Sequence, residues 1–371
     1  MAWRIDSTTT SVCLEGVRRV LDDAGMTIAD IDGIAARWSG PGGTVTQEDP
    51  DAADWANLLG IHVRYVDSTY PEGVPAVLAA AAAIRAGLCQ TVLIVGGEAG
   101  VLGSKEVAHY TRPANEFVIR FGSSTPAQFA LVAQRYLQRF PEGRRGMAET
   151  AATIRNMGAR NPEAIMFGRG SYTAEDVLDA PMIAEPFTRL DLCLANEGAA
   201  AMIVTSLERA QECPKRPVLL LGGGCEWARQ EYVEPPRYEE VGRIGVDAAK
   251  RAFTMAGVSP SDVDLLALYD PNSFEVLRQL EVLGFCKEGE ATDFAAGAGI
   301  GPTGRLPTNP DGGLLSHSHI GLGATSLRII EAVRQLRGEA GDRQIEGAEV
   351  AVATGGGSGA QYWNMLVLAR G

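Results

Sequence analysis

The chain has 371 residues, of which 46% are hydrophobic and 21% charged. This length and composition can bury a core large enough for two ordinary domains, which excludes a disordered chain. Acidic residues outnumber basic ones by 46 to 33 and are scattered, so the net charge of −13 is expected to repel nucleic acid.

The first half of the chain has the pattern of an α/β unit. A helix-like run at 15–23 leads into the segment 24–34, and a helical stretch at 79–87 precedes an apolar strand at 91–100 that runs into glycines. Helices alternating with strands are typical of α/β domains. No strand pattern precedes the first helix, so we expect the start of the chain to be trimmed or misassigned.

A long insertion follows between residues 101 and 186, where the sequence becomes polar and mixed. Helical periodicity returns at 126–139 and at 146–161. Thr173 is expected to cap a further helix, with Asp176 in the place of the usual Glu or Gln three residues later. We expect the insertion to lie over a face of the core.

The core pattern resumes with an apolar strand that starts near Ala199. The stretch 207–217 is polar and contains proline, as is typical of a linker between domains. We therefore predict an N-terminal domain at 1–212 and a C-terminal domain at 213–371.

The second half repeats the plan of the first. Ala256 and Gly257 lie 232 positions after Ala24 and Gly25, and the hydroxyl residue and the two aspartates that follow also match (Thr27 with Ser259, Asp30 with Asp262, Asp32 with Asp264). A helical stretch at 329–336 and a strand at 349–359 ending in glycines then match the close of the first half. This period is far too long for a solenoid, so it indicates two duplicated α/β domains.

The six cysteines are widely spaced and form no CxxC pair or Cys/His cluster. Neither a disulfide framework nor a zinc site is therefore predicted, and no metal or redox cofactor is indicated. The longest Ala-rich apolar run, 74–84, is well short of the roughly 20 residues that a membrane span needs. The first seven residues show no secretory pattern, so we expect a cytoplasmic protein.

Short motifs near the end of each half carry a family resemblance. The first half has Met-Ile-Ala-Glu-Pro at 182–186 and Asn-Glu-Gly-Ala-Ala-Ala at 196–201, and the second has Leu-Gly-Phe-Cys at 283–286 and Asn-Pro-Asp-Gly-Gly-Leu at 309–314. These motifs resemble the thiolase superfamily, and within it the sterol-carrier-protein-type branch, over nearly the whole chain. The resemblance implies a thiolase fold, in which two duplicated α/β domains form a five-layered αβαβα arrangement.

The family's catalytic positions are only partly retained. Tyr70 falls where thiolases carry the nucleophilic cysteine, and Ala353 falls where they carry the acid/base cysteine. His319 matches the histidine of the family's Gly-His-Pro motif, with one residue inserted nearby. Tyr269, before Asp270, stands where the branch usually has a histidine. Without the cysteines, two-step acyl transfer is not expected.

The sequence resembles instead the thiolase-like aldolases that shorten steroid side chains and lack these cysteines. The resemblance implies retro-aldol cleavage of a β-hydroxyacyl-CoA, which passes through an enolate and needs only directed donors to stabilise it. Tyr269 and Tyr362 are the predicted proton-transfer pair, although a phenol with a pKa of about 10 needs help to act as a base near neutral pH. His319 is expected to polarise the thioester oxygen or to assist one phenol.

Five further residues are predicted to bind substrate: Tyr70, Asn309, Gly356, Gly357 and Ser358. The glycine-rich stretch is expected at the floor of the site, just before Tyr362. Plainer interpretations stay open: Tyr70 as a plug in a vacated pocket, Asn309 as a residue that shapes the backbone under His319, and the glycines as a tight turn only. A tyrosine beside a glycine loop is also often a packing residue.

The leading hypothesis is therefore a carbon-carbon lyase acting on a CoA thioester, with no cofactor. The resemblance also implies a homodimer and a small OB-fold partner that handles the acyl-CoA. Two other functions stay open: a non-catalytic scaffold or acyl-CoA-binding subunit, and an acyltransferase that uses a displaced cysteine such as Cys89 or Cys286.

Overall fold

The computed structural model describes residues 1–36, 52–68, 73–99, 125–227, 239, 242–357 and 362–371. Two four-stranded sheets organise it. The first sheet has the order β2-β1-β3-β6 and the second has the order β7-β10-β9-β8. The first is built from β1 (Gly33–Ala36), β2 (Tyr65–Asp67), β3 (Thr91–Glu98) and β6 (Gly198–Thr205), and the second from β7 (Val218–Trp227), β8 (Leu265–Ala267), β9 (Val350–Gly357) and β10 (Tyr362–Arg370).

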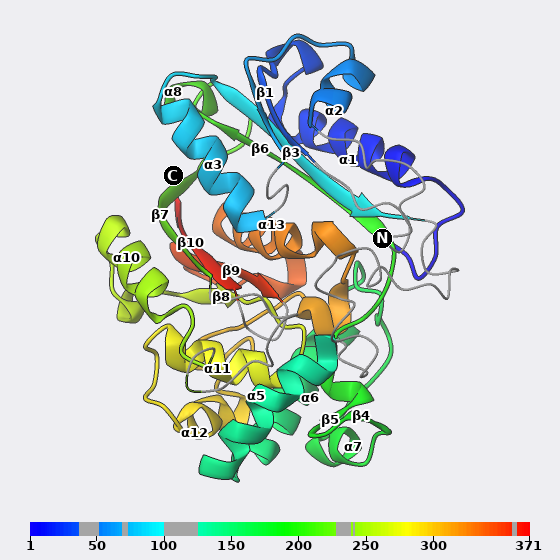
Figure 1. Cartoon of the computed structure of the whole chain (residues 1–371), viewed down its shortest axis with the longest axis vertical. Coiled ribbons are helices and arrows are strands. Elements are labelled where there is room, and N and C mark those ends of the chain that lie inside the picture. The colour runs from blue at the N-terminus through cyan, green and yellow to red at the C-terminus, as the bar shows by residue number, and fades with distance from the viewer. Residues whose placement is uncertain (37–51, 69–72, 100–124, 228–238, 240–241, 358–361) are drawn as a thin grey trace.

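Helices cover both sheets and fill the space between them (Figure 1). Outside the first sheet lie α1 (Thr9–Ala24) and α2 (Ala52–Leu59), and outside the second lie α10 (Val246–Ala256) and α11 (Ser273–Val282). The middle layer is formed by α3 (Gly73–Arg85) and α13 (Ala324–Arg337), which contact each other and both sheets. The predicted five-layered αβαβα arrangement is confirmed.

The predicted helices and strands are close to those observed, with boundaries that differ by a few residues. The helix predicted at 79–87 is α3, which begins at Gly73, and the one predicted at 329–336 is α13, which begins at Ala324. The proposed domain boundary falls between the short helix α8 (Leu207–Ala210) and β7. Among the described residues, no helix is both long and apolar enough to cross a membrane.

The described part of the insertion contributes α5 (Thr125–Arg139), α6 (Gly143–Arg160), α7 (Ala174–Leu178), β4 (Met182–Ala184) and β5 (Phe187–Thr188). Thr173 and Asp176 form the predicted capping box at the start of α7. Although it belongs to the first half in sequence, α6 packs against α11 and α12 (Ala291–Ala295) of the second half, and its apolar side chains join the same core cluster. The insertion therefore binds the two halves together.

Two pairs of repeated residues have the same structural role in each half: Thr27 with Asp30, and Ser259 with Asp262. In the first half, the Asp30 carboxylate accepts the backbone N–H of Thr27 at 2.8 Å, and in the second half Asp262 accepts that of Ser259 at 2.8 Å. Both pairs form capping boxes around a short 3-10 turn, which satisfies backbone donors that would otherwise lack a partner. The sequence repeat is therefore also a structural one.

The second repeated aspartate of each half lies before one strand and accepts hydrogen bonds from the backbone at the start of the neighbouring strand. Asp32, just before β1, accepts the backbone N–H of Thr91 at the start of β3 at 2.8 Å. Asp264, just before β8, accepts the backbone N–H of Val350 at the start of β9 at 2.9 Å. Each carboxylate therefore fixes the register of two neighbouring parallel strands, β1 with β3 and β8 with β9.

Removing either carboxylate should destabilise the protein. We expect Asp32→Ala and Asp264→Ala each to lower the free energy of unfolding by about 1–3 kcal/mol, because two backbone donors at the start of a strand lose a charged acceptor. Urea unfolding measures this. Asp22→Ala is the matched control, since Asp22 is exposed and pairs only with Arg18 on the surface of α1. Equal losses in all three variants would contradict the assigned role.

Candidate active site

One edge of the second sheet gathers the predicted site residues. Strands β8 and β9 run parallel, so their carboxyl ends lie at the same edge, and the antiparallel β10 begins there. Tyr269 follows the end of β8 by two residues, Gly355–Gly357 close β9, and Tyr362 opens β10 opposite Gly357. Carboxyl ends of parallel strands are the usual place for ligands in α/β proteins.

The end of β9 lies against both tyrosines, and the absence of a side chain at Gly357 makes room for the phenol of Tyr362. A Cβ atom at Gly357 would collide with the hydroxyl of Tyr362, whereas one at Gly356 would make an ordinary contact of 3.4 Å with Cδ1 of Tyr269 and would lie 3.0 Å from the carbonyl oxygen of Tyr362. Tyr269 is 8% exposed and Tyr362 is half-buried. Both rings therefore lie against the same glycine segment, Gly355–Gly357.

A single buried carboxamide on α11 holds this arrangement together. Gln279 Nε2 donates to the carbonyl of Tyr269 at 2.7 Å, while its Oε1 accepts from Thr354 Oγ1 at 2.6 Å and from Trp363 Nε1 at 3.1 Å. Thr354 Oγ1 in turn accepts the backbone N–H of Tyr269 at 2.8 Å. The N–H and the carbonyl of Tyr269 are therefore both hydrogen-bonded. Thr354, which precedes the glycine segment, and Trp363, which follows Tyr362, bond to the same Gln279 side chain.

The amino ends of two helices meet next to the glycine segment. The backbone N–H of Gly73, at the start of α3, donates to Ser326 Oγ at 3.1 Å in the first turn of α13. Thr325 of the same turn lies against Gly355, where a Cβ atom would be 3.3 Å from Thr325 Cγ2. Helix amino ends carry partial positive charge, so this convergence favours an anion, although the N–H of Gly73 is itself donated to Ser326.

His319 lies on a loop that the first half of the chain holds. The side chain of Asn196, just before β6, accepts the backbone N–H of His319 at 2.7 Å, and the backbone N–H of Asn196 donates to the carbonyl of His319 at 3.3 Å. Asn196 Nδ2 also donates to Ser318 Oγ at 2.9 Å. Burial lowers the pKa of His319, so the imidazole is neutral near pH 7 and one ring nitrogen carries a hydrogen that can be donated.

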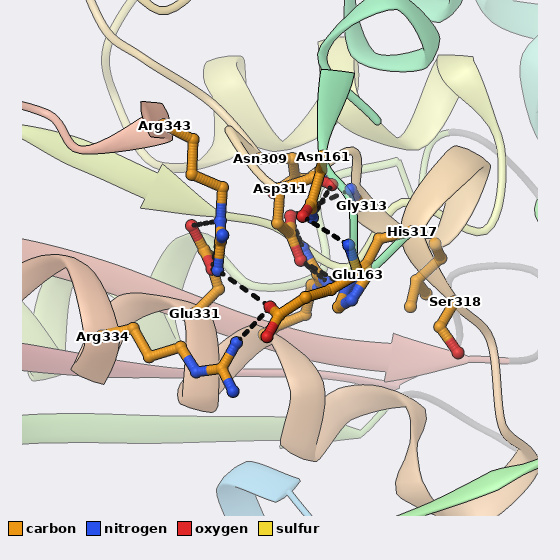
Figure 2. Close-up of polar contacts among 12 residues, drawn as sticks. Asn161, Glu163, Asn309, Asp311, Gly313, His317, Ser318, Glu331, Arg334 and Arg343 are labelled. Carbon is orange, nitrogen blue, oxygen red and sulfur yellow. Dashed lines mark hydrogen bonds and ion pairs between the residues drawn. The ribbon is translucent and has the colours of Figure 1, made fainter. Parts of the chain in front are cut away.

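Buried charges lie beside the residues that lead into this loop, and Figure 2 shows Asp311 near His317 and Ser318. Arg328 forms two hydrogen bonds with Asp311, at 2.8 and 2.6 Å, and His317 Nδ1 lies 2.8 Å from the same carboxylate. Burial acts to raise the pKa of Asp311, but the Arg328 charge and His317 hold it well below its usual range. This fully buried pair anchors α13 to the turn of π-helix at Gly313–His317 that leads to His319.

Asp270 connects Tyr269 to the same turn. Its carboxylate accepts the backbone N–H groups of Leu314 at 2.8 Å and Leu315 at 3.3 Å. Burial raises the pKa of Asp270 to about 7, against the opposing charge of Arg328. Asp270 therefore links the segment after β8, which contains Tyr269, to the turn that leads to His319.

Asn309, which is predicted to bind substrate, supports the backbone at the end of β8. Asn309 is fully buried with φ of 51°, and Oδ1 accepts the N–H of Leu268 at 2.6 Å while Nδ2 donates to the carbonyl of Leu268 at 3.0 Å. Asn tolerates this left-handed backbone conformation. These bonds give Asn309 a structural role beside the strand end.

Two other residues predicted to bind substrate, Tyr70 and Ser358, lie outside the described residues. Gly356 and Gly357 contact the two phenols, as described above. Ala353, at the place of the second thiolase cysteine, is fully buried within β9.

The free cysteines are poorly suited to be nucleophiles. Burial raises the pKa of Cys89, and it raises the pKa of Cys193 and of Cys286 to about 12. A thiol with a raised pKa holds little of the reactive thiolate near neutral pH. Neither Cys89 nor Cys286 lies in the glycine segment or in the contacts that surround it.

Gln279, Thr354 and Asn196 were missed as site residues by sequence reasoning. Asn196 lies in one of the quoted family motifs, which was a usable signal. Gln279 gave none, because a polar residue within an amphipathic helix pattern is indistinguishable from a surface position until its neighbours are known.

Comparison with known proteins identifies relatives. Residues 243–370 match the family model described as thiolase C-terminal domain-like. The chain is 33% identical over 364 residues to 17-hydroxy-3-oxo-4-pregnene-20-carboxyl-CoA lyase of Mycobacterium tuberculosis, covering 92% of this chain and 90% of that protein. It is 30% identical over 346 residues to acetyl-CoA acetyltransferase of Methanothermobacter thermautotrophicus, covering 91% of this chain and 89% of that protein.

A solved structure described as Ltp2-ChsH2(DUF35) aldolase matches all of this chain and 94% of that chain, with a TM-score of 0.83 and 27% sequence identity. The similarity therefore extends over both halves and includes the insertion.

The shifted pKa of Asp270 predicts a pH-dependent stability. An aspartate has a pKa near 3.9 when unfolded, so the folded protein binds the proton more tightly, and the stability that Asp270 contributes is lost as pH rises from about 4 to about 7. Between pH 5 and pH 8 the wild type should lose on the order of 2 kcal/mol of unfolding free energy relative to Asp270→Asn. Exposed Asp293→Asn serves as the control. Parallel pH profiles for wild type and Asp270→Asn would refute the shift.

Proposed function

The chain belongs to the thiolase superfamily, and we propose that it is a carbon-carbon lyase that cleaves a β-hydroxyacyl-CoA by a retro-aldol reaction. The products are a ketone and a shortened acyl-CoA. The name of the Mycobacterium tuberculosis relative, a pregnene-carboxyl-CoA lyase, supports a steroid side chain as the substrate.

The observation that carries this proposal is the position of two phenols against one glycine segment, at the sheet edge where two helix amino ends meet. Acid/base groups and an anion-stabilising site are what a retro-aldol reaction needs. A cysteine at the place of Ala353 would have indicated acyl transfer instead.

In the proposed reaction, one phenolate removes the proton from the β-hydroxyl group. The oxygen lone pair forms the ketone carbonyl, and the bond between the α and β carbons breaks. Its electron pair becomes the enolate of the acyl-CoA, whose α carbon then takes a proton from the second phenol. Atoms and electrons balance without an oxidant or a reductant, so the proposal requires no redox cofactor.

Each residue has a defined part in this scheme. Tyr269 and Tyr362 carry the two proton transfers, one as base and the other as acid. The partial positive charge at the amino ends of α3 and α13 and an N–H of the neutral imidazole of His319 are proposed to stabilise the thioester oxygen as it gains negative charge. Gln279 acts through Tyr269 and is a positioning residue.

A second candidate is thiolase-type acyl transfer, which the similarity to an acetyl-CoA acetyltransferase favours. It requires a nucleophilic thiolate. Burial raises the pKa of Cys89 and raises that of Cys286 to about 12, which opposes this function for both candidate thiols.

We also propose that the active protein is a homodimer that works with a small OB-fold subunit to bind the acyl-CoA. The description of the similar solved structure names two components, Ltp2 and ChsH2(DUF35), which supports a second subunit. An enzyme of this kind is expected to be inactive without its partner.

The two phenols can be tested directly. We expect Tyr269→Phe and Tyr362→Phe each to lower kcat by about 10²–10⁴-fold, because each removes one proton-transfer group while keeping the ring. The assay follows the paired ketone and shortened acyl-CoA by mass spectrometry, with a tertiary β-hydroxyacyl-CoA as substrate. Tyr172→Phe, on the insertion, is the matched control. Full activity in both site variants would remove the tyrosines from the mechanism, and no cleavage by wild type with partner and bound substrate would favour a scaffold.

Cysteine independence has its own test. Alkylation of the accessible thiols with iodoacetamide is expected to leave turnover within about twofold of the untreated enzyme, since no step uses a thiolate. Mass spectrometry identifies the modified cysteines. Loss of turnover that follows modification of Cys89 or Cys286, and that Ala substitution reproduces, would instead support the acyltransferase.

A further inference from the structure

Asn364 is a buried asparagine whose carboxamide oxygen has no partner. It lies on β10, two residues after Tyr362, and is 2% exposed. In the part of the chain that the structure describes, no donor reaches Asn364 Oδ1, although this atom is shielded from solvent. A buried acceptor without a hydrogen bond destabilises the folded state, so its presence in a native protein needs an explanation.

The side chain of Asn364 faces the middle layer of helices. Trp363 and Met365 belong to the core cluster that contains the α11 side chains, whereas Leu366 belongs to the cluster that α3 and α13 share. Side chains alternate between the two faces of a strand, so Asn364 and Tyr362 lie on the same face as Leu366. The carboxamide and the phenol of Tyr362 are therefore on the side of the sheet that α3 and α13 cover.

The carboxamide fills the space over Gly355 that a side chain would occupy. A Cβ atom at Gly355 would collide with Asn364 Oδ1 and would lie 3.3 Å from Thr325 Cγ2, so these three residues meet. Thr325 belongs to the first turn of α13, and its hydroxyl lies against Gly73 at the start of α3. The unpartnered oxygen is therefore aimed at the place where the two helix amino ends converge.

The next position along β9 leaves further room. Asn364 pairs with Gly355 and Leu366 pairs with Ala353, so Ala353 is the neighbouring β9 residue on the same face. Ala353 stands where the resemblance to thiolases places their acid/base cysteine. The carboxamide of Asn364 therefore lies beside the place of that cysteine.

A carboxamide can supply what the helix ends lack. Their partial positive charge favours an anion, but the N–H of Gly73 is already donated to Ser326. A carboxamide turned by 180° occupies the same volume and presents its NH2 group where the oxygen lay. Side-chain amides of this kind are among the donors that stabilise a developing oxyanion.

We propose that Asn364 is a further catalytic residue, whose Nδ2 donates a hydrogen bond to the thioester oxygen of the acyl-CoA as it becomes the enolate oxygen. This inference rests on the proposed lyase reaction, in which that oxygen gains negative charge when the bond between the α and β carbons breaks. Asn364 transfers no proton, so the balance of the reaction is unchanged. The thioester carbonyl of the shortened acyl-CoA accepts the same hydrogen bond.

The test uses Asn364→Leu, which keeps the approximate size of the side chain and removes its polar groups. Calorimetric titration measures the affinity for butyryl-CoA and for S-butyl-CoA, a thioether of equal length without the carbonyl oxygen. We expect wild type to prefer the thioester by about fivefold and the variant to bind both equally, because one hydrogen bond is lost. In turnover, kcat should fall by about 10²–10³-fold, with KM changed by less than about threefold.

Thermal unfolding separates a ligand-binding amide from a structural one. Asn161 is the matched control, a buried asparagine whose Nδ2 donates to the carbonyl of Asp311 at 2.9 Å and whose Oδ1 accepts the N–H of Glu163 at 3.0 Å. Asn161→Leu should therefore lower the Tm. Asn364→Leu should raise it by about 2 °C, because an unpartnered acceptor leaves the interior.

A lower Tm for Asn364→Leu, no preference for the thioester in wild type, the same preference in wild type and variant, or unchanged kcat in the variant would each overturn the proposal. The affinity ratio does not depend on cleavage. Loss of the preference in Asn364→Leu, in a protein that cleaves no β-hydroxyacyl-CoA, would therefore refute the lyase and still support Asn364 as the donor to the thioester oxygen.

Discussion

The candidate site depends on the Gln279 carboxamide, which is buried and has partners at both ends. A carboxamide can donate and accept at fixed angles, so one side chain binds the carbonyl of Tyr269, the threonine before the glycine segment and the tryptophan after Tyr362. Unpaired polar groups are costly in a low-dielectric interior, so each of these bonds constrains the others. Two tyrosines almost a hundred residues apart in the sequence therefore lie against the same glycines.

The two duplicated halves also meet at the candidate site. The amino end of α3 comes from the first half and that of α13 from the second, and they meet through Gly73 and Ser326. Asn196 of the first half holds the backbone of His319 of the second. Neither half alone contains the two helix ends, the imidazole loop and the tyrosine pair, so the site requires both.

The desolvation of buried charge beneath the site is offset at Asp311 but only partly at Asp270, whose pKa burial raises to about 7. The Arg328 guanidinium makes two hydrogen bonds to Asp311, and Asp270 accepts two backbone N–H groups. A buried ion pair contributes little net stability compared with apolar packing, but removal of one partner is strongly destabilising because the other is left uncompensated. Such a network fixes the loop that leads to His319, which suits the donor role proposed for that imidazole.

The sequence by itself determined the duplicated α/β plan and the family, because these follow from local patterns and short motifs. It also matched Asp30 with Asp262 and Asp32 with Asp264, and it indicated Tyr269, Tyr362 and His319 by their places relative to the motifs. It did not show that Leu268 occupies the amide of Asn309, and it did not find Gln279, because the partners of a buried polar group are chosen by packing between segments distant in the sequence. Only the tertiary structure decided what the matched aspartates bind, which phenols share a glycine segment and where the helix amino ends converge, because these are relations between strands and helices that no local pattern encodes.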